Sequence, residues 1–156
     1  MWLFLLACTF GVTSPQSEVP LPSVVALITV DTWRADHIGP EVTPAIWRLA
    51  QKGERYTNAW SPMGLTTPSH ASMLTGLAPW EHGVLANNHH GYALSAAPQT
   101  VPERYPDWAR GAFVSAYPAG PEGGMRRGWE VFDGPEAGER SGQETVQKAM
   151  AWLPRD

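Results

Sequence analysis

The stretch TTPSHASMLTGLAPWEHGVLAN, residues 66–87, is the most informative part of this chain. A hydroxyl residue followed by Pro68, small helix-compatible residues and then Gly76 predicts a short helix that begins at Thr66. The first N–H groups of a helix have no partner within it, and the helix dipole is positive at that end. A phosphate or sulfate group could bind there, beside a hydroxyl nucleophile. The alternative is a plain helix cap with Pro68 inside the first turn.

Upstream of this segment, VVALITV at residues 24–30 predicts a fully buried parallel strand, because it is a continuous β-branched apolar run between polar ends. Asp31 follows it directly. Ligands of open α/β sheets collect at the carboxyl ends of strands, so Asp31 is a candidate ligand for Zn²⁺, Ca²⁺ or Mg²⁺. Further ligands have to come from elsewhere, and a strand-end or helix-capping carboxylate is the alternative.

The remaining elements alternate between helix and strand, which predicts an α/β layer structure. We expect helices at 44–52, 100–109 and 143–153, strands or extended segments at 55–59 and 112–116, and a Gly/Pro loop at 118–128. In the last helix, apolar residues recur on one side: Val146, Ala149, Met150 and Leu153.

Several polar side chains near Thr66 are further candidates. Thr67, Ser69 and Asn87 could donate hydrogen bonds to a group that is being transferred. Four histidines fall within 21 residues, but their spacing does not match a closed zinc site, and surface or loop positions are the alternative: His70, His82, His89 and His90. Asp36 and His37, after an arginine, are interpreted as a local hydrogen-bonding pair.

Composition indicates one folded, loop-rich domain. The chain has 156 residues, 15 Gly, 15 Pro and eight Trp, and its hydrophobic content of 43% argues against disorder. Its net charge is −4, and the few Lys and Arg residues are scattered, so we expect no nucleic-acid-binding surface. A single cysteine, Cys8, excludes an internal disulfide.

Residues 1–22 are interpreted as a leader and linker. Leu5-Leu6-Ala7-Cys8 resembles the lipobox of bacterial lipoproteins, in which the cysteine is lipidated. This predicts an exported protein that is periplasmic, extracellular or anchored to a membrane through Cys8. A cleaved secretory signal, a misplaced start and a disordered tail are the alternatives, since the apolar run is short and no Lys or Arg precedes it. It is also too short to span a bilayer.

Four blocks in order, VVALITVDTWRADHIG, TPAIWRLAQKGERYTNAWSP, TTPSHASMLTGLAPWEHGV and GAFVSAYP with RRGWEVFD, resemble the N-terminal half of the sulfatase family, within the alkaline phosphatase superfamily. The resemblance implies an α/β fold with a mostly parallel sheet flanked by helices, of which residues 23–156 form the N-terminal half only. It also implies that Asp31 binds metal, that Thr66 is the nucleophile and a metal ligand, and that His70 stands where sulfatases usually carry an arginine.

Two departures from the sulfatase pattern favour phosphoryl over sulfuryl transfer. Sulfatases convert a Cys or Ser to formylglycine, and Thr66 cannot undergo that conversion. The pattern T-x-P-[NS]-H, here Thr66 to His70, is similar to the nucleotide pyrophosphatase/phosphodiesterase branch, where the threonine itself is the nucleophile on two zinc ions. Asn87 lies where that branch carries an asparagine that helps to bind a phosphoryl oxygen. In addition, Thr32 replaces the second Asp of the sulfatase pair.

The resemblance thus implies a metal-dependent hydrolase of small-molecule phosphoric or sulfuric esters, with Zn²⁺ or Ca²⁺ as cofactor. Members of the superfamily draw their remaining metal ligands from a C-terminal half, so we expect an incomplete ligand set here and exposed apolar faces. The alternatives are a piece of a longer hydrolase and a non-catalytic remnant that keeps an anion pocket.

Overall fold

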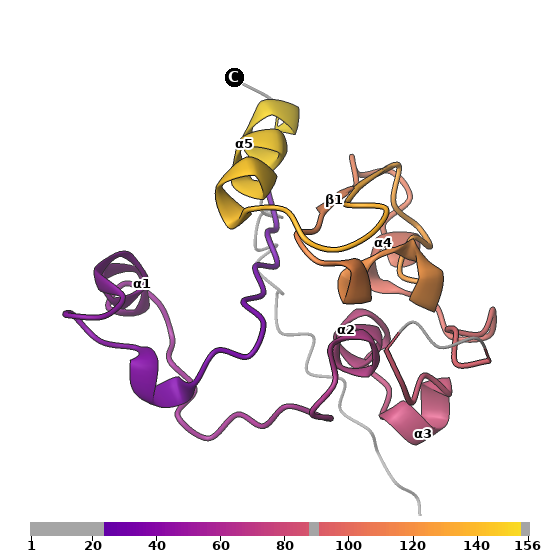
Figure 1. The fold of residues 1–156 in the computed structure, drawn as a ribbon, viewed down its shortest axis with the longest axis horizontal. Coiled ribbons are helices and arrows are strands. Elements are labelled where there is room, and N and C mark those ends of the chain that lie inside the picture. Colours follow the sequence, from indigo (N-terminus) through magenta and orange to yellow (C-terminus); the bar gives the residue numbers. More distant parts are fainter. Residues whose placement is uncertain (1–23, 88–90, 154–156) are drawn as a thin grey trace, which may run out of the picture. The chain divides into compact units, whose positions relative to one another are not determined.

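The computed structural model describes residues 24–87 and 91–153 (Figure 1). The chain divides into two compact units, residues 1–32 and 33–156, and each is treated by itself. The described part of the first unit, residues 24–32, contains no helix or strand. All the elements named below belong to the second unit.

The prediction of a strand at residues 24–30 is wrong. This segment has no regular secondary structure, and its large side chains are exposed, Ile28 by 81%. An apolar run is consistent with a buried strand only if neighbouring strands and covering helices are present, and composition cannot guarantee them. Among the described residues, the sheet is formed by two other segments of the chain, which pair with each other.

The first elements of the second unit are a short 3₁₀ helix, η1 (Ala35–His37), and helix α1 (Pro44–Ala50). As predicted, α1 begins after Thr43 with Pro44 in its first turn, although it ends two residues before Lys52. The Thr43 hydroxyl donates to the carbonyl of His37 at 3.1 Å, so it tethers the preceding turn instead of capping the helix. Residues 55–59 form no strand.

Helix α2 (Thr66–Thr75) confirms the predicted helix start at Thr66 and its end before Gly76. Gly76 has a φ of 73°, in the left-handed region that glycine adopts readily, and its N–H donates to the Ser72 carbonyl at 2.8 Å. A four-residue helix, α3 (Pro79–His82), follows at once. The Glu81 carboxylate accepts a hydrogen bond from the N–H of Ala78 at 2.7 Å and so caps α3.

The buried core of the second unit surrounds α2. Trp129 and Phe132 pack against a small cluster of buried apolar residues: Ala71, Leu74, Val84, Leu94 and Met125. These residues come from α2, from the segment after α3 and from two later loops. Residues 66–87 therefore supply three of the five buried apolar residues of this cluster and also contain the candidate site.

The sheet consists of strands β1 (Gly111–Phe113) and β2 (Val131–Asp133), which run parallel with Ala112 opposite Phe132. A strand was predicted at 112–116, but β1 is shorter and only partly buried, while β2 was not predicted. Between the strands lie two 3₁₀ turns, η2 (Tyr117–Ala119) and η3 (Pro121–Gly123).

Two more helices complete the unit. Helix α4 (Val101–Arg104) is shorter than the predicted 100–109, because its last turn ends before Pro106. Helix α5 (Gly142–Trp152) matches the prediction closely and packs on β1, where the rings of Phe113 and Trp152 lie 5.8 Å apart. Two residues of its predicted apolar side, Val146 and Met150, are each 60% exposed. Mixed helices with a small parallel sheet are compatible with part of an alkaline-phosphatase-like fold.

Within residues 24–87 and 91–153, no helix has both the length and the hydropathy needed to cross a membrane.

Candidate active site

Thr66 is the first residue of α2 and is partly buried. Leu65 before it is extended, with a φ of −132°, and makes no side-chain cap. Thr67 and Pro68 behind it are buried, so the first turn of the helix is anchored by its second and third residues. The chain thus reaches Thr66 through the exposed, extended Leu65 and continues from it into the core.

The Asn87 side chain contacts the first turn of α2. Its side-chain oxygen Oδ1 accepts a hydrogen bond from the backbone N–H of Thr67 at 2.9 Å. Because an N–H needs an acceptor, this contact fixes which end of the amide faces the helix. The Nδ2 group, which can donate two hydrogen bonds, is at the other end. Two residues that are 21 positions apart, Thr66 and Asn87, are therefore brought to the same helix start.

The backbone N–H groups of this turn are less open to an anion than the sequence suggested. The Thr67 N–H is used by Asn87, Pro68 has none, and the Ser69 N–H donates to the Leu65 carbonyl at 3.2 Å. A donor for a bound anion is therefore better supplied by the Asn87 side chain than by these N–H groups.

Two of the hydroxyl groups expected to donate to a ligand donate to backbone carbonyls instead. The Thr67 hydroxyl, on a residue with no exposed surface, donates to the Pro118 carbonyl at 2.6 Å. The Ser69 hydroxyl donates to the Met63 carbonyl at 2.7 Å. Both hydrogens are directed at backbone oxygens, so the prediction that these groups donate to a transferred group is wrong. The Pro118 contact was not foreseen, and no local pattern signals it, because it joins residues 51 positions apart.

His70 is half-buried on α2, one turn beyond Thr66. Its Nδ1 lies 2.9 Å from the Thr66 carbonyl, which can only accept, so Nδ1 carries the hydrogen. In the neutral ring Nε2 is then an acceptor, and only the protonated ring can donate from Nε2 to an anion. This limits the oxyanion-binding role predicted for His70 to its protonated form.

His82 is 1% exposed, so it is a core residue. Its Nε2 lies 2.9 Å from the Ser72 hydroxyl, and its Nδ1 accepts the backbone N–H of Val84 at 3.1 Å. Burial lowers the pKa of His82 below its ordinary value, against smaller opposite effects of the Pro68 carbonyl and Glu81. For this histidine, the structure supports a packing role rather than a metal role.

Asp31 belongs to the first unit and is exposed. Thr32, which follows it, has a φ of 51°, a conformation that β-branched residues rarely adopt and that costs about 1–3 kcal/mol. An Asp carboxylate is chemically suited to Zn²⁺ or Ca²⁺. However, no group of three or more His, Cys, Asp or Glu side chains within residues 24–87 and 91–153 could hold a metal ion. The described residues do not complete a metal site.

The other sequence candidates lie apart from this site or outside the described residues. Asp36 and His37 form the predicted local pair, with Asp36 Oδ1 3.0 Å from His37 Nδ1, and Arg34 also binds that carboxylate. These contacts lower the pKa of Asp36, and the Arg34 contact has the largest effect. His89, His90 and Cys8 are outside the described residues.

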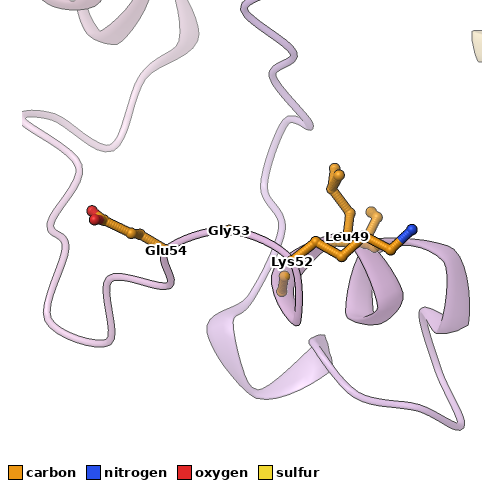
Figure 2. A pocket seen from close by; sticks show the side chains of 6 residues that line it. Leu49, Lys52, Gly53 and Glu54 are labelled. Atoms are coloured by element: carbon orange, nitrogen blue, oxygen red, sulfur yellow. The ribbon is translucent and has the colours of Figure 1, made fainter.

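A cavity of about 330 Å³ lies beside α1, and none of the candidate residues lines it. Figure 2 shows Leu49 and Lys52 at this helix and the Glu54 side chain pointing away from it. The cavity is formed by consecutive segments of the chain: Ile46, Leu49, Ala50, Lys52, Gly53 and Glu54. Neither Thr66 nor another candidate residue lines it, so α2 remains the candidate site.

Comparison with known proteins shows which proteins the chain is similar to. The chain is 36% identical over 91 residues to an ulvan-active sulfatase of Formosa agariphila, a match that covers 54% of the chain and 18% of that protein. It is 29% identical over 148 residues to human N-acetylglucosamine-6-sulfatase, covering 83% of the chain and 26% of that protein. It is 33% identical over 72 residues to a pyrophosphatase/phosphodiesterase of Schizosaccharomyces pombe, covering 42% of the chain and 14% of that protein. No solved structure matches the chain.

These similarities agree with the resemblance to the alkaline phosphatase superfamily that the ordered sequence blocks indicated. The sequence profile of type I phosphodiesterases and nucleotide pyrophosphatases matches residues 25–125, more than half of the chain, and the chain belongs to that family. It spans about a quarter or less of the length of each of these curated relatives.

Proposed function

We propose that this chain carries the nucleophile part of an exported, metal-dependent hydrolase that cleaves phosphoric esters, with Thr66 as the nucleophile. The observation that supports this most strongly is the contact between Asn87 Oδ1 and the Thr67 N–H, at 2.9 Å. It brings an amide donor to the helix turn that begins with Thr66, and attack by a hydroxyl on a phosphorus centre needs such a donor for the developing charge.

The proposed reaction is attack by Thr66 Oγ1 on phosphorus, with departure of the alcohol and hydrolysis of the resulting threonine ester by water. The Nδ2 group of Asn87 donates to a non-bridging oxygen, and the protonated form of His70 adds a second donor. Charge spreads over these oxygens in the transition state, so fixed donors act most strongly there.

Thr66 favours phosphoryl transfer, although two of the relatives are sulfatases. A threonine hydroxyl is a weak nucleophile at its own pKa and has to be ionised by its surroundings. Family members are generally metal-dependent. When bound, a divalent cation such as Zn²⁺ or Ca²⁺ supplies this ionisation and neutralises charge on the ester. We propose Asp31 and Thr66 each as a metal ligand, with further ligands outside the described residues.

The wider proposals combine this family membership with the N-terminal sequence. The fold is part of an alkaline-phosphatase-like α/β domain over residues 23–156, preceded by a leader at 1–22. The substrate is a small phosphate or sulfate ester. The protein is exported, and Cys8 is a candidate for lipid attachment to a membrane.

The test is hydrolysis of bis(p-nitrophenyl) phosphate, p-nitrophenyl phosphate and p-nitrophenyl sulfate by the purified protein with Zn²⁺ or Ca²⁺. We expect the diester to react fastest and Thr66→Ala to lose on the order of 10³-fold or more in kcat. Thr43→Ala removes a threonine hydroxyl at the start of α1 and should leave hydrolysis unchanged. Unchanged hydrolysis in Thr66→Ala would eliminate the nucleophile assignment, and faster sulfate hydrolysis would eliminate the phosphoryl preference.

Metal content separates this proposal from its alternative, a non-catalytic anion-binding protein. Stoichiometric zinc or calcium in the purified chain would support the catalytic proposal. Phosphate binding without retained metal and without hydrolysis supports the alternative instead.

A further inference from the structure

His82, the last residue of α3, contacts both helix α2 and the segment after α3. It stands at the end of α3 and is buried against α2, with 1% of its surface exposed. Its ring contacts the Ser72 hydroxyl at 2.9 Å and the Val84 N–H at 3.1 Å, and the Pro68 carbonyl lies close enough to affect its titration. Pro68 is in the first turn of α2, so the ring reaches the turn that begins with Thr66.

The Val84 contact determines the tautomer of this ring. A backbone N–H can only donate, so Nδ1 must hold a lone pair and the hydrogen must be on Nε2. The Nε2–H group then faces the Ser72 hydroxyl and the Pro68 carbonyl, both of which can accept. Each ring nitrogen therefore has a matched partner only while the ring is neutral.

We propose that His82 is a pH-sensitive positioning residue, whose neutral ring holds the first turn of α2 in place and whose protonation releases that turn. In the protonated ring both nitrogens carry hydrogen, so Nδ1–H meets the Val84 N–H and one of these two donors loses its partner. A buried donor without an acceptor is costly, and here a buried positive charge is added.

The groups around the ring give little compensation for that charge. Helix α2 presents an uncharged hydroxyl and a carbonyl, from Ser72 and Pro68, and the segment after α3 presents the Val84 N–H. Glu81 is the charged group that favours the protonated ring, and its carboxylate also binds the Ala78 N–H. The other titratable side chain of α2, His70, is bound to the Thr66 carbonyl.

The direction of the pH effect follows from burial. Burial lowers the pKa of His82 in the folded chain, so the unfolded chain binds the proton more readily. The stabilisation is complete above the ordinary histidine pKa, near 6.5, and is lost as the pH falls from there to the folded-state pKa. In that interval the opening equilibrium shifts about tenfold per pH unit.

The test uses nitrogen-15 NMR on the whole chain. We expect the His82 ring to be the Nε2–H tautomer at pH 7.5, and the protection factors of the Ser69 and Val84 amides to fall by at most about tenfold per pH unit between pH 6.5 and the folded-state pKa. His82→Asn keeps an acceptor for Val84 without a titrating ring, so its protection factors should not vary with pH. Ser72→Ala keeps the titrating ring and should retain the pH dependence, which covers the case in which His82→Asn does not fold.

An Nδ1–H tautomer, or protection factors independent of pH in both the unsubstituted chain and Ser72→Ala, would overturn the proposal. Its link to catalysis rests on the proposed function and has a separate readout. We expect the acid limb of the kcat profile to flatten in His82→Asn while KM for the diester stays within about twofold, since the ring acts through the helix turn. If the NMR results hold and no variant hydrolyses any ester, the positioning role stands and the proposed function fails.

Discussion

The side-chain oxygen of Asn87 accepts the backbone N–H of Thr67 at 2.9 Å, so a side chain from the loop after α3 caps the helix that begins at Thr66. An asparagine is well suited to this position, because one end of its amide can stabilise the helix start while the other can donate to a bound anion. The two ends can be tested separately by substitution.

Asn87→Asp keeps an oxygen acceptor for the Thr67 N–H but replaces the donor end with a negative charge. We expect thermal stability equal to or above that of the unsubstituted chain, because a carboxylate is favourable at a helix N-terminus. We expect kcat/KM for the phosphodiester to fall about 10²–10³-fold, the usual loss when an oxyanion donor is removed. Asn87→Ala should lose both properties, and full activity in Asn87→Asp would refute the donor role.

Thr67→Val removes the hydroxyl that donates to the Pro118 carbonyl at 2.6 Å, at a residue with no exposed surface. The carbonyl loses a partner in the core, so we expect the free energy of unfolding to fall by about 1–3 kcal/mol in urea titration. Thr67→Ser keeps the hydroxyl and should recover most of the loss. Equal stability of the Val and Ser variants would show that the hydrogen bond contributes nothing.

Glu103 should make stability depend on pH in the acid range. Burial favours its neutral form, but hydrogen bonds from the Thr100 N–H at 2.8 Å and from Arg127 outweigh burial and lower its pKa. Its stabilising contribution is therefore complete above the ordinary carboxyl pKa and is lost as the pH falls through the lowered value. In urea titrations from pH 6 to pH 3, Glu103→Gln should lose less stability than the unsubstituted chain. Glu122→Gln, at an exposed position of η3, is the control and should follow the unsubstituted chain.

Gly128→Ala should be strongly destabilising. Gly128 has a φ of 81°, and a Cβ there would lie 2.7 Å from the backbone nitrogen of Glu103. Gly138 has a similar φ of 71° but open space around it, so Gly138→Ala measures the cost of the left-handed backbone alone, about 1–2 kcal/mol. We expect Gly128→Ala to lower the free energy of unfolding by more than this cost, as measured by thermal unfolding. Equal costs for the two variants would mean that Glu103 moves aside freely.

Local signals in the sequence were sufficient for the bounds of two helices, α2 and α5. A hydroxyl residue, a proline and a terminating glycine fixed both ends of α2, and the pattern of α5 predicted its range within a residue. Helix α3 was missed although its signals are present: Pro79 in the first turn, Glu81 at the third helical position and Gly83 after the end. Four residues give too few repeats for a periodicity to be seen.

The strands and the site contacts could not be predicted in the same way, because they depend on distant partners. Residues 24–30 have strand composition without a strand partner among the described residues, whereas Val131–Asp133 forms a strand in only three residues because β1 lies beside it. Asn87 was a candidate donor from the sequence and from the family resemblance, but its contact with Thr67 follows only from the fold. The directions of the Thr67 and Ser69 hydroxyls were likewise beyond sequence patterns.

The hydrogen bond from Thr67 to Pro118 also bears on the order of folding. The end of α2 is closed by Gly76, a local event, whereas its first turn is joined to residues 51 positions further along the chain. Closing a loop of that length is entropically costly and slow, so the helix can form from its C-terminal end before its first turn is fixed. The Thr67 N–H is also bonded to a distant side chain, that of Asn87, so pulse-labelled amide exchange during refolding should protect Gly76 before Thr67. During synthesis from the N-terminus, the turn that carries the proposed nucleophile is completed only after the chain has passed residue 118.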